Sequence, residues 1–152
     1  MSKISEKDIE RAILIIDKFK EELGMEADRE LKMAKSYIQS FGPAIINNGL
    51  LPAIAFYEKN ETQSEGTRYY TMRMVYYMLC PKNEKDEIKF KNEKDYKPLL
   101  MNHVLEKMGP IIKLNDINIK KAEKEIIKAV IALKTVIRLY VPSNMEVEDN
   151  GN

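Results

Sequence analysis

Residues 37–56 read YIQSFGPAIINNGLLPAIAF, and this stretch decides how the first half of the chain folds. A helical pattern leads up to Gly42-Pro43, which predicts a bend or a break, because proline removes a backbone donor and disfavours helical geometry one residue earlier. Pro43 then suits the first turn of a short helix that ends at about Gly49, and Pro52 suits the first turn of an apolar helix running to about Tyr57. The stretch carries packing geometry and no catalytic side chains. It therefore favours a structural or binding module over an enzyme.

The helix expected before this stretch covers residues 6–23. Ser5 and Asp8 resemble a capping box, with Asp in place of the usual Glu, and Gly24 stands where a left-handed cap belongs. Apolar side chains recur between them at helical spacing, at Ile9, Ala12, Ile13, Ile16, Phe19 and Leu23. A second helix begins near Asp28 and leads to Gly42-Pro43.

The middle of the chain is harder to assign. Residues 69–80 alternate well enough for a strand, but their length and their methionines favour a buried helix that Pro81 ends. Residues 81–92 alternate lysines with acidic residues and are predicted to form a mobile loop.

Two further helices are expected. Asp95-Tyr96-Lys97-Pro98 opens the first, and Gly109-Pro110 stops it. Residues 117–140 form the longest helix, about 36 Å at 1.5 Å per residue. The fold class is therefore all-α: a single compact bundle of about six helices with a long C-terminal helix. Residues 1–141 make the domain and residues 142–152 a disordered acidic tail.

Composition fits a protein of the cytoplasm. Charged residues make up 32% of the chain and hydrophobic residues 44%. Cys80 is the single cysteine and cannot form an internal bridge, which fits a reducing compartment. The N-terminus is polar and acidic where a secretion signal would be basic and then apolar, and no apolar run approaches the roughly 20 residues that cross a bilayer.

A formal net charge of +1 conceals a gradient along the chain. Residues 1–30 carry a net −3, whereas residues 117–140 carry a net +4. At 100° per residue the last helix has one apolar face and an opposite face that is cationic, with Lys121, Lys124, Lys128 and Arg138 on it and Lys120 and Lys134 beside it. This face is either an ordinary solvated surface or a surface for an anionic polymer.

Two apolar residues lie on the basic side of the same helix. Ile127 and Ile131 are four residues apart. They either mark a protein-binding surface or touch a neighbouring helix.

Cations also alternate with aromatic rings between Arg68 and Tyr77. Single-stranded nucleic acid is bound by that combination, although such tyrosines more often belong to a core. Arg73 from this segment, and Lys35, are weaker candidates for RNA contact.

No residue pattern predicts catalysis, a metal site or a cofactor. His103 is the only histidine and has no serine or cysteine nucleophile near it in sequence. Cys80 stands among apolar residues before a proline and is interpreted as a small core side chain. Gly42 and Gly49 lack the lysine and the spacing of a phosphate-binding loop.

The chain resembles a known family. The pattern consists of Tyr37-x-x-Ser40, Pro43, Ile46-x-Asn48-Gly49-Leu50 and Ala53-x-Ala55-Phe56, followed by Asp95-Tyr96 and the closing Leu133-Lys134-x-x-x-Arg138. It is similar to the signature of the small helical subunit of type III-B CRISPR effector complexes. The likeness spans residues 8–141. The family often has a tryptophan before an adjacent basic pair, and here there is no tryptophan and the pair is spread over a turn.

This resemblance implies a non-catalytic helical subunit that stacks in the minor filament beside the backbone subunits. Its basic surface would help to hold crRNA and target RNA through their phosphates. The expected partners are the backbone and large subunits, the two RNAs and further copies of the chain. Two alternatives stay open: a helical adaptor that binds only protein, and the small subunit of the related type III-A complex.

Overall fold

The computed structural model describes residues 4–59, 66–80, 88–90, 98–108 and 116–141. The expected loop over 81–87, the helix opening at 95–97, the stop at 109–110 and the expected acidic tail 142–152 lie outside these residues.

Helix α1 (Glu6–Leu23) has the bounds that its sequence predicts. Ser5 Oγ accepts a hydrogen bond from Asp8 N at 3.1 Å, and Asp8 Oδ2 accepts one from Ser5 N at 2.9 Å, which completes the capping box. At the other end Gly24 adopts φ 58°, a conformation that few residues other than glycine take without strain. A short 3₁₀ turn, η1 (Gly24–Glu26), connects α1 to the next helix.

Helix α2 (Ala27–Asn48) is continuous through Pro43, so the predicted break into two helices is wrong. Pro43 removes the hydrogen bond to the carbonyl of Gln39, but both residues are exposed, which places that carbonyl where water can bind it. Gly42 has no Cβ to meet the proline ring. Phe41 and Ile45 are fully buried on either side, and their packing holds the helix together.

Helix α3 (Leu50–Glu58) follows at once, because Gly49 turns the chain with φ 95°. The remaining helices are α4 (Gly66–Leu79), α5 (Leu99–Met108) and α6 (Asp116–Tyr140). The helical interpretation of residues 69–80 and the long last helix are confirmed. The part of the chain that the structure describes contains helices and no strand, which confirms the all-α class.

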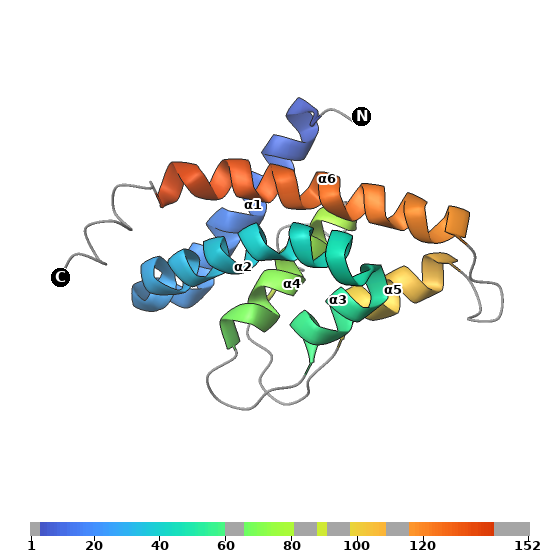
Figure 1. The fold of residues 1–152 in the computed structure, drawn as a ribbon. Coiled ribbons are helices and arrows are strands. Elements are labelled where there is room, and N and C mark those ends of the chain that lie inside the picture. The colour runs from blue at the N-terminus through green and yellow to red at the C-terminus, as the bar shows by residue number, and fades with distance from the viewer. Residues whose placement is uncertain (1–3, 60–65, 81–87, 91–97, 109–115, 142–152) are drawn as a thin grey trace.

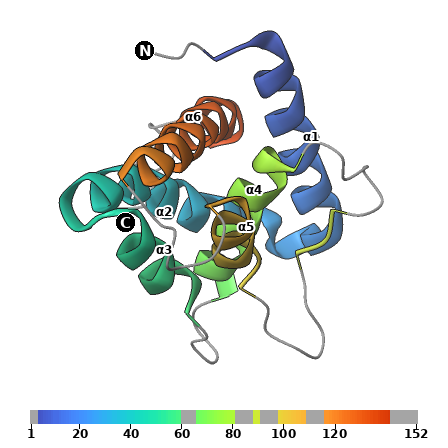
Figure 2. The same ribbon diagram turned by 90° about the vertical axis from the view of Figure 1, so that its right-hand side faces the viewer.

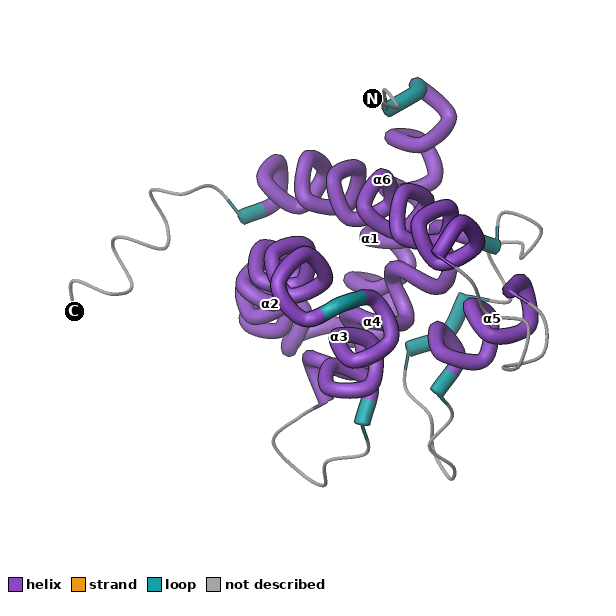
Figure 3. Tube along the Cα trace, turned by 45° about the vertical axis from the view of Figure 1, so that its right-hand side comes forward, coloured by secondary structure: helices purple, strands orange, loops and turns teal. Residues whose placement is uncertain are grey.

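Helix α6 lies across the other helices and packs on α1, α2 and α4 (Figure 1). Seen along α6, α1 runs down one side of the molecule and α2 and α3 lie on the other (Figure 2). Helix α5 packs against α3 and α4 below the near end of α6 (Figure 3). All of α6 except its outer face is therefore buried by the bundle.

Residues 88–90 are packed into the bundle, which corrects the prediction of a mobile loop for this part of 81–92. Ile88 and Phe90 are fully buried. The Phe90 ring meets the Phe19 ring edge-on with centroids 5.0 Å apart, and Phe90 N donates to Glu22 Oε2 at 2.8 Å. These partners lie far away in sequence, so local charge could not reveal them.

Among the described residues, no helix is both long enough and apolar enough to cross a membrane.

Candidate nucleic-acid interface

Packing of α6 fixes which of its side chains reach solvent. The buried face consists of Ile126, Ala129, Val130, Ala132, Leu133, Val136 and Ile137. Opposite it, Lys121, Lys124 and Arg138 are exposed, as is Lys120, while Lys128 and Lys134 are partly exposed. These six cations are called the α6 row below. The amphipathic pattern of the sequence placed them on this face.

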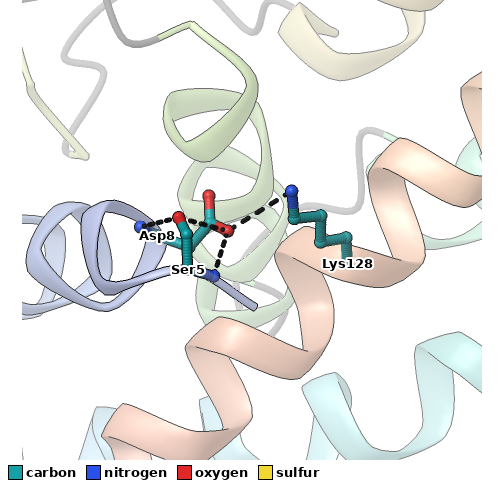
Figure 4. A network of polar contacts seen from close by, with 3 residues as sticks. All are labelled: Ser5, Asp8 and Lys128. Carbon is teal, nitrogen blue, oxygen red and sulfur yellow. Dashed lines mark hydrogen bonds and ion pairs between the residues drawn. The ribbon is translucent and has the colours of Figure 1, made fainter. Parts of the chain in front are cut away.

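Lys128 has an acidic partner on another helix. Its Nζ lies 3.5 Å from Asp8 Oδ2, where the N-terminal turn of α1 meets α6 (Figure 4). The same oxygen accepts from Ser5 N and from Ser5 Oγ. Partial burial alone would raise the pKa of Asp8, but the bonds from Ser5 and the ammonium of Lys128 bring it below its ordinary value. The carboxylate is thus ionised at neutral pH and offsets the charge of Lys128.

Lys35 is not on the surface. Its side chain is 1% exposed, and Nζ donates to the carbonyl oxygen of Val141 at 3.0 Å. It ties α2 to the end of α6. The expectation that Lys35 contacts RNA is therefore corrected: a lysine enclosed in this way has a structural role.

Arg73 is also buried, with its guanidinium held inside the fold. Nη1 donates to the carbonyl oxygen of Lys89 at 2.9 Å, and Nη2 to the hydroxyl of Tyr69 at 2.6 Å. Tyr77 is buried as well, and its hydroxyl donates to the same carbonyl at 2.9 Å. Arg73 and Tyr77 are core residues that hold residues 88–90 in place. The expectation that Arg73 contacts RNA is therefore corrected.

The two isoleucines of α6 have different surroundings. Ile127 is partly buried and packs against the hydrophobic core. Ile131 is 43% exposed within the α6 row. Of these two residues, Ile131 can make an apolar contact with a partner. Ile127 contacts the other helices of the bundle, which is the second of the two interpretations given for it in the sequence analysis.

Cys80 and His103 come together, although the sequence gave no sign of it. Cys80 Sγ lies 3.6 Å from His103 Nδ1, at the junction of α4 and α5. Burial raises the pKa of the Cys80 thiol and lowers the pKa of the His103 imidazole. Both shifts favour the neutral forms, the opposite of the thiolate–imidazolium pair of a cysteine nucleophile. In the described part of the chain, no three His, Cys, Asp or Glu side chains gather as metal ligands.

Glu58 is a buried carboxylate that the sequence analysis missed. Its two oxygens each accept a 2.8 Å hydrogen bond from the first turn of α5, Oε2 from Leu100 N and Oε1 from Met101 N. Burial is the main influence on its pKa and raises it to about 7. A pKa near neutrality is typical of residues that transfer protons. Here, however, both oxygens of Glu58 cap the first turn of α5, which is a structural role.

A protein-family profile described as CRISPR-associated protein (Cas_Cmr5) matches residues 4–136. That is most of the chain. The chain belongs to the Cas_Cmr5 family. Comparison with curated proteins and with solved structures finds no match.

Membership of the Cas_Cmr5 family confirms the resemblance drawn from residues 37–56 and from the closing helix. It makes the chain a subunit of a type III CRISPR complex of the Cmr kind, with the other subunits of that complex as partners. The matched region includes α1 with Asp8, and α6 as far as Val136. The pairing of Asp8 with Lys128 is the feature of this interface that sequence reasoning missed, since no local spacing links the two residues.

Proposed function

We propose that this Cas_Cmr5 family member is a non-catalytic subunit of a type III-B complex that stacks in the minor filament and holds crRNA and target RNA by their phosphates. The observation that carries the proposal is the exposed face of α6, where Lys121, Lys124 and Arg138 reach solvent from one straight helix. Lys120 and Lys134 extend the same row. A row of ammonium and guanidinium groups on a rigid element suits a regular polyanion.

The α6 row is suited to contact with phosphates more than with bases. Its six members are all cations, and the tyrosines between Arg68 and Tyr77 that could stack on bases lie on α4, with Tyr77 buried. Phosphate contacts carry no sequence information and release counterions. Binding is therefore expected to fall steeply with salt and to tolerate any RNA sequence.

The test is charge reversal at two exposed members of the row, Lys121→Glu with Lys124→Glu. We expect a lower affinity for RNA at low salt and a slope of log affinity against log salt that is smaller by about one to two, because each lost phosphate contact removes roughly one unit. Fluorescence anisotropy with a labelled RNA measures both. Lys128 is avoided, because its reversal would also repel Asp8.

The matched control reverses two exposed cations outside α6, Arg29→Glu and Lys89→Glu, and so changes the net charge equally. Arg29 Nη2 lies 3.3 Å from Glu30 Oε1, but the Arg29 side chain is 74% exposed, so losing this contact costs little. RNA affinity of the control should stay close to that of the wild type. Equal losses in both double variants would mean that net charge matters and that the row has no special part, and unchanged binding in the α6 variant would remove the row from the proposal.

A protein-only adaptor is the second candidate, favoured by the exposure of Ile131. Ile131→Ser removes the apolar contact without adding charge. An adaptor that works through this residue would lose incorporation into the complex in a pull-down with the other subunits, and the wild-type chain would show no salt-sensitive retention of RNA. The RNA-binding proposal expects normal incorporation of this variant.

A further inference from the structure

The outer face of α6 changes character at Lys128. Four of the six cations of the α6 row lie at or before this residue. Ile131 and Leu139 follow it and are 43% and 72% exposed, and the exposed Thr135 lies between them. Successive members of this set are four residues apart, so their side chains form one line along the helix. An exposed line with two apolar residues suits a partner that brings apolar side chains of its own.

Two cations border this line. Arg138 is exposed and Lys134 is partly exposed. Residues 126–141 contain no Asp or Glu, so this part of the helix supplies no negative charge of its own. Ile131, Leu139, Lys134 and Arg138 are called the C-terminal patch below. Complementary binding to the C-terminal patch calls for a segment that combines apolar with acidic side chains.

The chain carries such a segment shortly after α6. Residues 145–149 read Met-Glu-Val-Glu-Asp and are called the tail segment below. Pro142 cannot continue a helix, and Ser143 and Asn144 are residue types that favour turns. A turn at these three residues would direct the tail segment back along α6.

The length of the tail segment matches the C-terminal patch. The chain leaves α6 at Val141, which is 3% exposed and whose carbonyl oxygen accepts the 3.0 Å hydrogen bond from Lys35 Nζ, so the starting point is held in place. An extended tail segment spans about 13 Å at 3.3 Å per residue. The distance from Leu139 to Ile131 is about 12 Å at 1.5 Å per residue of helix. A chain that turns back can therefore cover the patch without reaching the first half of α6.

We propose that the tail segment docks on the C-terminal patch of its own chain and competes there with RNA. Its two apolar residues contact Ile131 and Leu139. Its three acids offset the charges of Lys134 and Arg138. The competition rests on the proposed function, whereas the contact itself does not. Phosphates that reach the patch must displace the tail segment, so RNA meets a smaller cationic surface than the α6 row alone presents.

The proposed contact is weak and can be displaced. Exposed ion pairs each contribute little, and they are screened by salt. A short connection to α6 nevertheless gives the tail segment an effective concentration in the millimolar range at the patch. Weak contacts form at such concentrations. RNA can exchange with a segment that is held in this way.

Methyl NMR of the full chain tests the contact without RNA. The tail variant removes the three negative charges of the tail segment by Glu146→Gln, Glu148→Gln and Asp149→Asn. In this variant the methyl signals of Ile131 and Leu139 should shift in the direction in which high salt shifts them in the wild type, since both changes weaken ion pairs. Ile46, which is 72% exposed on α2, is the control and should not shift. Unchanged signals of Ile131 and Leu139 would overturn the contact.

A second variant tests the apolar part of the contact. Met145→Ser with Val147→Ser keeps all three acids, and it should also shift the methyl signals of Ile131 and Leu139. The absence of any shift would overturn the apolar contact. Differences between wild type and variant that grow with protein concentration would mean that the tail segment of another copy occupies the patch, and would overturn a contact within one chain.

RNA binding, measured by fluorescence anisotropy, tests the competition. At low salt the tail variant should bind RNA about fivefold more tightly than the wild type, the effect of one or two exposed ion pairs. The gain should disappear in a chain that also carries Lys134→Gln and Arg138→Gln, because the tail segment and RNA then no longer share these cations. With Lys120→Gln and Lys121→Gln instead, the gain should remain. A gain that persists without Lys134 and Arg138 would be an effect of net charge and would overturn the competition.

Failure of this proposal and failure of the proposed function give different results. If the α6 row does not bind RNA, Lys121→Glu with Lys124→Glu leaves RNA binding unchanged, while the signals of Ile131 and Leu139 still respond to the tail variant. That result overturns the competition and leaves the contact standing. If the tail segment does not dock, those signals do not respond, while the charge reversal on α6 still lowers RNA affinity.

Discussion

Glu58 joins two helices through a single buried side chain. It is the last residue of α3, and its carboxylate accepts from Leu100 N and Met101 N in the first turn of α5. Those N–H groups have no partner within their own helix, and the positive end of the helix dipole favours a negative charge there. Burial acts against the charged form and outweighs these bonds, since the pKa of Glu58 is raised to about 7.

The raised pKa of Glu58 predicts how stability changes with pH. From the ordinary value of 4.5 up to about 7, the folded chain binds a proton at Glu58 that the unfolded chain has released. Stability contributed by this group is therefore complete below about pH 4.5 and is lost as pH rises through 7. The loss is on the order of 3 kcal/mol at 1.36 kcal/mol per pKa unit. Urea unfolding at a series of pH values between 4.5 and 8 measures it.

Glu58→Gln is the control for this prediction. At pH 5 the wild-type Glu58 is protonated, and its carbonyl oxygen and its hydroxyl oxygen can still accept from the two N–H groups of α5, the hydroxyl weakly. The amide nitrogen of glutamine cannot accept, so we expect the variant to be slightly less stable than the wild type at pH 5, with a smaller fall in stability between pH 5 and 8. His103, whose pKa is lowered by burial, is the same in both proteins, so its contribution cancels in the difference. Parallel pH profiles for the two proteins would contradict the raised pKa.

At the scale of single helices, α2 shows how a helix continues through a proline. Pro43→Ala restores the N–H that can bond to the carbonyl of Gln39 and adds the helix propensity of alanine. The free energy of unfolding should rise by about 1–3 kcal/mol. Pro52→Ala is a matched control, because Pro52 lies in the first turn of α3, where its N–H would have no partner in the helix. Chemical denaturation of both variants checks the difference. A destabilising Pro43→Ala would mean that the fold depends on a bend at this proline.

Most helix bounds could be predicted from the sequence because their signals are local. Ser5, Asp8 and Gly24 set the two ends of α1 through hydrogen bonds and backbone geometry within the helix. The spacing of apolar residues in α6 can likewise be read from the sequence of α6 alone. Continuity of α2 could not be predicted, since it depends on Phe41 and Ile45 being held by other helices. The packing of Phe90 depends on Phe19 and Glu22 and leaves no local pattern at all.

The segment 88–90 offers a direct test of this long-range packing. Phe90→Ala removes a fully buried ring that contacts Phe19 and Tyr77. It should lower the free energy of unfolding by about 3–5 kcal/mol. Lys89→Ala, next to it and exposed, should change the stability by less than about 0.5 kcal/mol. Similar small effects of both substitutions, measured by urea unfolding, would mean that the segment is not part of the core.

Across the whole molecule, charge is distributed by the way the helices cross. The prediction that the cations of α6 lie on one face is correct, because it follows from the helical repeat of 3.6 residues per turn alone. It could not show that the acidic first turn of α1 reaches this face at Lys128, nor that Lys35 and Arg73 are enclosed. Each of these depends on contacts between residues distant in the chain. The exposed row is consequently divided by Asp8 into two parts, Lys120, Lys121 and Lys124 on one side and Lys134 and Arg138 on the other.

Asp8→Asn should therefore change stability and RNA affinity in opposite directions. Loss of the charge weakens the capping box and the interaction with the helix dipole, and should lower the free energy of unfolding by about 0.5–1 kcal/mol. The substitution also allows Lys128 to bind a phosphate and removes a negative charge from the middle of the row. RNA affinity should therefore rise severalfold at low salt, and the gain should shrink as the salt concentration increases. Anisotropy titrations at two salt concentrations and urea unfolding measure the two effects. Asp28→Asn makes the same charge change in the first turn of α2 and should leave RNA affinity unchanged; an equal gain in both variants would show that the effect is one of net charge and that Asp8 does not divide the row.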